Sequence, residues 1–241
     1  SRHAKFADTE YNLEPNVKSS PGGLRDLQII GWIAERHFKV ESLEELSTDK
    51  FLNPDELEIF NRGREFMWRV RYALHMIADR EEDRLLFDHQ RELADLWGFE
   101  DGDKLAVEQF MQVYYRWAKS LSQLNEVLIQ NFDQAILRAG TEDKIVLLDD
   151  QFQIRNGYLE VRRDDLFEID SSALMRLFLL CAQNDQIVAV GAPTIRLIRD
   201  NRHRVDDAFR ADEDNKRTFL EILRSPHKMT RQLRRMASYG I

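Results

Sequence analysis

The chain has 241 residues, of which 43% are hydrophobic and 32% are charged, and its formal net charge is -8. This composition predicts a folded protein with a sizeable core and excludes a disordered chain, while every apolar run is too short to span a bilayer. The negative charge argues against nucleic acid as a partner, and the single cysteine, Cys181, lies inside an apolar run and fits a reducing cytoplasm.

The amino-terminal segment 1–21 is predicted to be an irregular lead-in, because it shows no sustained apolar period and contains Pro15 and Pro21. The chain begins with Ser1, and the polar residues of mixed charge that follow do not resemble a signal peptide. We therefore expect this chain to be one piece of a longer protein.

Residues 22–140 have the apolar spacing of a helical bundle, with hydrophobic positions three and four residues apart. Glycine or proline marks several of the helix ends. These stripes of apolar positions predict helices over 24–38, 42–46, 53–78, 84–96 and 104–139. The four tryptophans fall at apolar helical positions and are predicted to lie in the core: Trp32, Trp68, Trp97 and Trp117.

The pattern changes over 141–163, where short runs of strand-forming residues surround Asp149-Asp150 and Asn156-Gly157. We expect one small β-hairpin or meander there. The C-terminal part, 164–241, returns to helical spacing, and helices are predicted over 172–183, 193–209, 212–224 and 227–238. The predicted fold class is therefore mainly α, a multi-helix bundle with one small β element.

The turn that opens the first helix is the most informative stretch for binding. Gly22 and Gly23 would let main-chain N–H groups approach an anion at the helix start, while Lys18 and Arg25 add positive charge and Asp26 holds one of them in place. On this interpretation, Gly23→Val weakens anion binding without unfolding the protein. An ordinary tight turn with Arg25 and Asp26 paired on the surface explains the same residues, because short glycine motifs are weak signals.

Two further candidates lie on the long second helix. Arg71 and His75 are four residues apart and so share one helical face. They either face a triphosphate or form a polar contact inside a bundle. The six histidines are dispersed and show no metal-binding pair on one helix, so no metal ligand is predicted.

Three runs of the sequence resemble one enzyme family. They are Tyr11-Asn-Leu-Glu-Pro-Asn-Val-Lys18, Pro21-Gly-Gly-Leu-Arg-Asp-Leu-Gln28 and Ile30-Gly-Trp-Ile-Ala-Glu-Arg-His-Phe38. They are similar to the region that follows the nucleotidyltransferase core of bifunctional PII uridylyltransferase/uridylyl-removing enzymes, and a related pattern occurs in glutamine synthetase adenylyltransferases. The resemblance continues through the Arg71 to His75 helix and the run Asp88-His-Gln-Arg-Glu-Leu-Ala94 to the end of the chain.

The resemblance implies an enzyme that controls nitrogen assimilation by transferring UMP from UTP to a tyrosine of PII and by removing it again. In that family a Gly-Ser motif and an Asp-x-Asp pair hold Mg²⁺ and UTP, and an HD domain performs the hydrolysis. Neither motif is present here. Asp212-Glu-Asp214 has the Asp-x-Asp spacing, but it follows no Gly-Ser and suits a helix start. His-Asp does not occur as a dipeptide. No catalytic or metal-binding residue is therefore assigned, and the segment alone is expected to be inactive.

By this resemblance the chain lies between an upstream nucleotidyltransferase core and a downstream HD domain, and PII, UTP and Mg²⁺ are partners of the whole enzyme. The segment then walls the transferase cleft. Its candidate nucleotide-binding residues are Lys18, Gly22, Gly23, Arg25, Arg71 and His75, supported by Asp26. The alternative is a non-catalytic interaction or spacer module that couples the transferase and hydrolase domains.

Overall fold

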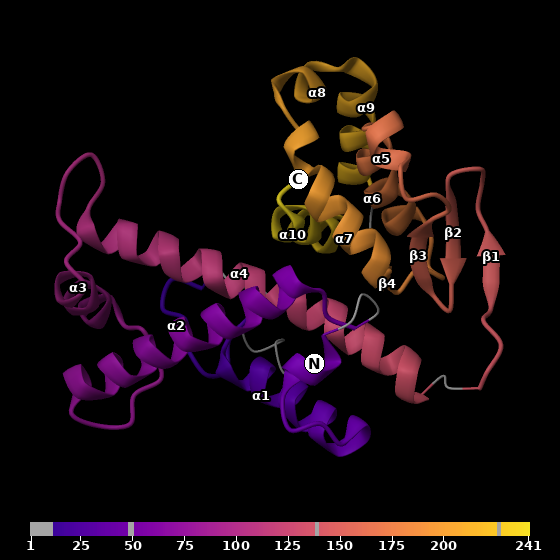
Figure 1. Ribbon diagram of the computed structural model, residues 1–241. Helices are drawn as coiled ribbons and strands as arrows, with labels where there is room; N and C mark the ends of the chain where they lie inside the picture. Colours follow the sequence, from indigo (N-terminus) through magenta and orange to yellow (C-terminus); the bar gives the residue numbers. More distant parts are fainter. Residues whose placement is uncertain (1–11, 48–50, 138–139, 226–227) are drawn as a thin grey trace. The chain divides into compact units, whose positions relative to one another are not determined.

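The computed structural model describes residues 12–47, 51–137, 140–225 and 228–241 (Figure 1). The chain divides into two compact units, Ser1–Ile136 and Leu137–Ile241. It is mainly helical with one small sheet, which confirms the predicted fold class. None of the helices in the described ranges is long and apolar enough to cross a membrane. The finer division into four segments stays a prediction.

Four α-helices form the described part of the first unit: α1 (Leu24–Ile33), α2 (Pro54–Ala78), α3 (Phe87–Leu96) and α4 (Ala106–Phe132). Helix α1 continues as a π-helix over Ala34–Phe38, α4 continues as a π-helix over Asp133–Leu137, and a 3-10 helix spans Leu43–Leu46. The two long helices, α2 and α4, cross each other, and α1 and α3 each pack against both of them (Figure 1).

Helix α2 begins where the sequence predicts it. The Asn53 side chain accepts a hydrogen bond from the Glu56 N–H (2.8 Å), and the Glu56 carboxylate accepts one from the Asn53 N–H (3.0 Å). Pro54 follows as the first helical residue, a position that needs no N–H donor. This reciprocal cap fixes the helix start.

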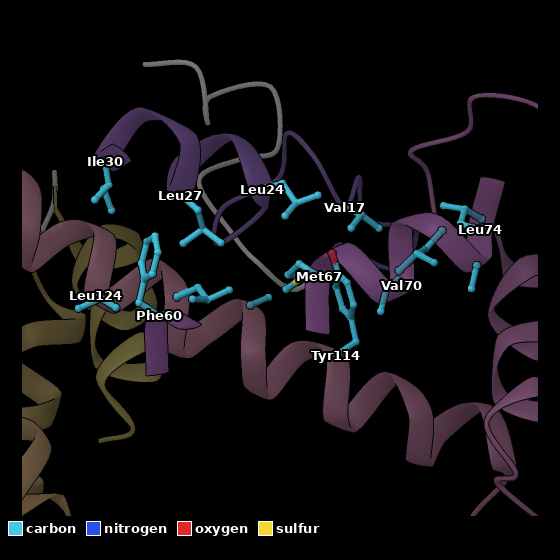
Figure 2. Packing of buried hydrophobic residues seen from close by; sticks show 14 of the residues in the cluster. Val17, Leu24, Leu27, Ile30, Phe60, Met67, Val70, Leu74, Tyr114 and Leu124 are labelled. Atoms are coloured by element: carbon cyan, nitrogen blue, oxygen red, sulfur yellow. The ribbon is translucent and has the colours of Figure 1, made fainter. Parts of the chain in front are cut away.

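The core of the first unit joins the lead-in to the helices. Figure 2 shows its packing, in which residues of the lead-in and α1 face α2 and α4: Val17, Leu24, Leu27 and Ile30 against Phe60, Met67, Val70, Leu74, Tyr114 and Leu124. Full burial of such a side chain contributes about 1.5–3 kcal/mol relative to exposure. Because Val17 is fully buried, the turn that follows it is held against α2.

The prediction that all four tryptophans lie in the core is wrong for two of them. Trp32 is 62% exposed and Trp68 is 45% exposed. Trp32 lies about 200° around α1 from the buried Ile30, so it is turned away from the core. The other two tryptophans, Trp97 and Trp117, are half-buried and pack against the Phe66 ring.

Two helix boundaries of the first unit differ from the prediction. Helix α3 begins at Phe87 instead of residue 84, because the residues before Phe87 pair with the lead-in. Helix α4 begins at Ala106 and ends at Phe132, inside the predicted range 104–139, of which residues 138–139 lie outside the described residues.

The second unit combines a four-stranded sheet with short helices. The strands are β1 (Ile145–Leu147), β2 (Phe152–Arg155), β3 (Tyr158–Val161) and β4 (Ala189–Val190). Their order is β1-β2-β3-β4, antiparallel except for the parallel pair β3 and β4. The turn between β2 and β3 is Asn156–Gly157, with φ of 55° and 89°, as expected for this dipeptide in a two-residue hairpin.

The helices of the second unit follow β3 along the chain. They are α5 (Leu166–Ile169), α6 (Ala173–Gln183), α7 (Ala192–Asn201), a 3-10 helix (Arg202–Arg204), α8 (Asp207–Ala211), α9 (Glu213–Leu223) and α10 (Met229–Tyr239). Strand β4 lies between α6 and α7. Cys181 on α6 is buried, and burial raises the pKa of its thiol to about 11. Its predicted position in the apolar interior is thus confirmed.

The single helix predicted over 193–209 is wrong. Helix α7 ends at Asn201, and α8 starts after Asp206, whose carboxylate accepts a hydrogen bond from the Phe209 N–H (2.8 Å). An aspartate that caps a new helix also breaks the preceding one, although the apolar spacing runs through it. Strand β4 and helix α5 were not predicted, because two and four residues are too short to show a period.

Candidate functional site

The lead-in 12–17 is paired with the loop that precedes α3. The Val17 N–H donates to the Asp83 carbonyl (2.8 Å), and the Leu85 N–H donates to the Pro15 carbonyl (2.9 Å). This short antiparallel pairing fixes the segment next to the C-terminal end of α2, so the irregular lead-in has a defined course.

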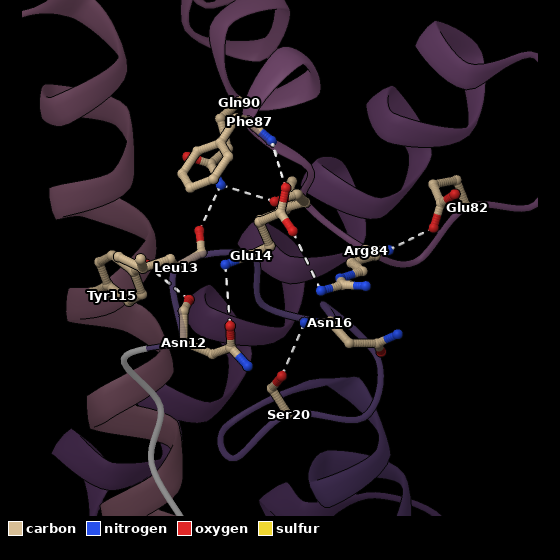
Figure 3. A network of polar contacts seen from close by, with 11 residues as sticks. Asn12, Leu13, Glu14, Asn16, Ser20, Glu82, Arg84, Phe87, Gln90 and Tyr115 are labelled. Atoms are coloured by element: carbon tan, nitrogen blue, oxygen red, sulfur yellow. Dashed lines mark hydrogen bonds and ion pairs between the residues drawn. The ribbon is translucent and has the colours of Figure 1, made fainter. Parts of the chain in front are cut away.

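Buried side-chain contacts strengthen this pairing, as Figure 3 shows. The amide of Gln90, only 3% exposed, donates to the carbonyls of Leu13 (2.7 Å) and Leu85 (2.8 Å). The Glu14 carboxylate accepts from the Phe87 N–H (3.2 Å). The Gln90 amide thus has two main-chain partners and connects the lead-in to α3.

The turn into α1 uses its own main-chain donors. Every N–H from Gly22 to Asp26 donates within the turn: to the Asp26 carboxylate, and to the carbonyls of Ser20, Val17, Lys18 and Gly23, over 2.8–3.0 Å. A phosphate contact through the Gly22 or Gly23 N–H would require these bonds to open. Anion contacts at this turn therefore depend on side chains.

The two glycines instead permit close packing. Gly22 has φ of +73°, and a Cβ there would lie 1.9 Å from the Ala118 carbonyl oxygen of α4. At Gly23 a Cβ would lie 2.7 Å from the Val17 carbonyl oxygen, so Gly23→Val would force the main chain of the turn to shift, which argues against the expectation that this change affects anion binding alone. Pairing of Asp26 with Arg25 on the surface is also wrong, because Asp26 is 2% exposed and binds the Gly22 N–H.

Two cationic side chains, Lys18 and Arg25, extend from adjacent points of this turn. The Arg25 N–H donates to the Lys18 carbonyl (2.8 Å), and both side chains are half-buried. Within the described residues neither side chain makes a hydrogen bond or an ion pair. Half-buried cations that no carboxylate contacts directly can still bind an anionic ligand, and two together favour a polyanion.

A carboxylate that the sequence analysis missed gathers three of the predicted residues. Arg71 Nε donates to Asp83 Oδ1 (2.6 Å), and His75 Nε2 lies 3.5 Å from the same oxygen. Burial opposes the charged carboxylate, but the hydrogen bond and charge of Arg71, the His75 contact and the charge of Lys18 outweigh burial and lower the pKa of Asp83. Asp83 therefore stays ionised and fixes Arg71.

The structure thus brings Lys18, Arg71 and His75 together around Asp83, with Arg25 on the same turn as Lys18. Asp83 lies in a charged loop, Asp79-Arg-Glu-Glu-Asp-Arg84, where nothing in the sequence distinguishes it from its acidic neighbours. The signal that would have indicated it is the need of a half-buried arginine on α2 for a counter-charge.

The described residues contain no group of three or more His, Cys, Asp or Glu side chains arranged to hold a metal ion. Asp83, the carboxylate of the cluster, already binds Arg71. We therefore assign no metal ligand in these parts of the chain.

Two family models match the chain. Residues 1–129 match the model described as GlnD PII-uridylyltransferase, and residues 152–241 match the model described as uridylyltransferase GlnD third domain. The chain belongs to the GlnD PII-uridylyltransferase family. The first match covers the lead-in, the glycine turn and the Asp83 cluster, and the second covers most of the second unit.

Curated relatives agree along the whole chain. It is 52% identical over 241 residues to the bifunctional uridylyltransferase/uridylyl-removing enzyme of Pseudomonas aeruginosa (strain UCBPP-PA14), 49% identical over 242 residues to that of Azotobacter vinelandii, and 48% identical over 242 residues to that of Pseudomonas fluorescens (strain SBW25). Each alignment covers 100% of this chain and 27% of the relative. No solved structure matches the chain.

Proposed function

We propose that this chain is the helical segment of an enzyme that transfers UMP from UTP to a tyrosine of PII and removes it, and that its first unit walls the transferase cleft. The family membership and the identity to named enzymes along the whole chain support the reaction. The rest of that enzyme would supply the metal-bound chemistry, with Mg²⁺ and UTP bound there, in the cytoplasm.

The observation that carries the role of this segment is the pair of cations at the glycine turn. Lys18 and Arg25 lie at adjacent points of one turn, and within the described residues their side chains make no hydrogen bond or ion pair, although the charge of Lys18 acts on Asp83. Catalysis of phosphoryl transfer depends mainly on positioning and on stabilising charge on the phosphates. Two preset cations at the wall of a cleft provide both.

Asp83 acts as a positioning residue in this proposal. It forms an ion pair with Arg71, and the charge of Lys18 helps to lower its pKa, so its carboxylate attracts both cations. The Gln90 amide, which donates to the carbonyls of Leu13 and Leu85, holds the lead-in against the loop that precedes α3.

The test is Lys18→Ala in the intact enzyme that contains this chain. We expect the rate of UMP transfer to PII to fall about tenfold to a hundredfold, because a charge-assisted contact contributes roughly 1.5–3 kcal/mol and each 1.4 kcal/mol is a factor of ten. Uridylyl removal should keep its rate, since the hydrolase site is separate. Transfer and removal are measured on the same preparation.

Arg62→Ala is the matched control. Arg62 is an exposed cation of the same unit that pairs with Glu58 one helical turn away, far along α2 from the cluster. It should change neither activity. If Lys18→Ala transfers UMP at the wild-type rate, the proposed wall role is wrong.

A second candidate role is that of a spacer or interaction module coupling the transferase and hydrolase domains. The division into two compact units, each with its own family match, favours it. A pure coupling module predicts that Lys18→Ala keeps both rates unchanged and alters only how one activity responds to the state of the other. The same variant thus separates the two candidates.

A further inference from the structure

A hollow in the first unit lies between α1, the segment after it and α2. Its volume is about 290 Å³, and its lining includes the aromatic Trp32 and Trp68, the polar Gln28 and the charged Glu35, Glu41 and Arg64. Trp32 is 62% exposed and Trp68 is 45% exposed, although large aromatic side chains of a folded domain are usually mostly buried. Two exposed indole rings at one hollow indicate a surface that binds a planar ring.

Space and polar groups in the hollow fit such a ring. A Cβ added at Gly31 would meet no atom within 4 Å, so the wall of α1 leaves room there. The Gln28 amide makes no hydrogen bond within the described residues and offers one acceptor and two donors. The edge of a nucleobase carries both donors and acceptors, whereas a tyrosine ring carries a single hydroxyl.

The hollow adjoins the cation cluster along α2. The Arg71 guanidinium lies over the Trp68 ring, 5.4 Å from its centroid, and this contact joins the two sites. From Trp68 to His75 the helix axis advances about 10 Å, a length comparable to that of an extended nucleoside triphosphate. A base in the hollow would thus place its phosphates toward Lys18 and Arg71.

We propose that this hollow binds the nucleobase of the nucleotide substrate by stacking on Trp32 and Trp68, with Gln28 bonding the base edge. This inference rests on the proposed function and adds to it a base-binding site that is separate from the cations that would bind the phosphates. Base–aromatic stacking tolerates any base, so the amide of Gln28 provides the selectivity.

The test compares the binding of UTP and of inorganic triphosphate to the intact enzyme by calorimetry. Trp32→Ala should lower the affinity for UTP about tenfold or more and leave the affinity for triphosphate unchanged, because stacking on one ring is lost and the cations remain. Gly31→Leu should do the same by filling the hollow, and it introduces a good helix former where there is space. Tyr72→Ala removes a 70% exposed aromatic of α2 that does not line the hollow and should change neither ligand.

The outcomes separate this inference from the proposed function. The base site alone is overturned if Trp32→Ala and Gly31→Leu both bind UTP with wild-type affinity while Lys18→Ala binds it more weakly. Equal weakening of UTP and triphosphate overturns it too, since the effect would then act on the phosphates. If these two variants keep their UTP affinity but bind the protein acceptor more weakly, the hollow binds a tyrosine instead. If Lys18→Ala also binds UTP and transfers UMP as the wild type does, both proposals fail.

Discussion

Gly22→Val should strongly destabilise the first unit. A Cβ at this position would lie 1.9 Å from the Ala118 carbonyl oxygen, and φ of +73° is a left-handed conformation that a β-branched residue adopts only with strain. Left-handed backbone costs roughly 1–2 kcal/mol and overpacking typically about 1–3 kcal/mol, so we expect a loss of about 3 kcal/mol or more in the free energy of unfolding. Urea unfolding of the 241-residue chain measures it.

Gly31→Ala is the control for this prediction. Gly31 lies within α1, and a Cβ there meets nothing within 4 Å. Alanine should therefore stabilise the helix by about 0.5–1 kcal/mol. A Gly22→Val protein as stable as the wild type would show that α1 and α4 do not approach each other as closely as described.

Asp83→Ala should also destabilise the first unit, by about 1–3 kcal/mol near neutral pH, because it leaves the half-buried Arg71 guanidinium without its partner. Since the pKa of Asp83 is lowered in the folded state, its contribution is present above the ordinary carboxyl pKa of about 3.9 and is lost as pH falls through the lower folded value. The difference from wild type should shrink below about pH 4.

A double variant tests whether the effect comes from the unpaired charge. Arg71→Leu together with Asp83→Leu removes both partners and should recover part of the lost stability, because an apolar pair leaves no buried charge. Equal stability differences for Asp83→Ala at pH 7 and pH 3 would show that the carboxylate contributes nothing through its charge. Thermal or urea unfolding at the two pH values gives the comparison.

The sequence predicted those features that depend on local patterns. The Asn53-Pro54 start of α2 and the Asn156–Gly157 turn follow from the chemistry of two or three neighbouring residues. The stripes identified the long helices, because apolar period and helical period coincide over many residues. The resemblance identified the family, which the comparisons then showed.

Features that depend on what an element packs against could not be predicted. A glycine pair permits approach by a ligand or by the chain itself, and only the position of Ala118 shows that Gly22 serves the second purpose. Likewise, apolar spacing does not tell Met67 in the core from its exposed neighbour Trp68. The pairing of Arg71 with Asp83 joins residues on either side of a loop, and no short-range pattern encodes it.

Photolabelling tests most directly whether this segment walls the nucleotide site. The intact enzyme is irradiated with UTP that carries a photoreactive group on its terminal phosphate, with and without excess UTP, and the labelled peptides are mapped. We expect label that UTP displaces within residues 12–36 or 64–90, which contain Lys18, Arg25 and Arg71. Displaceable label found only outside these 241 residues would contradict it.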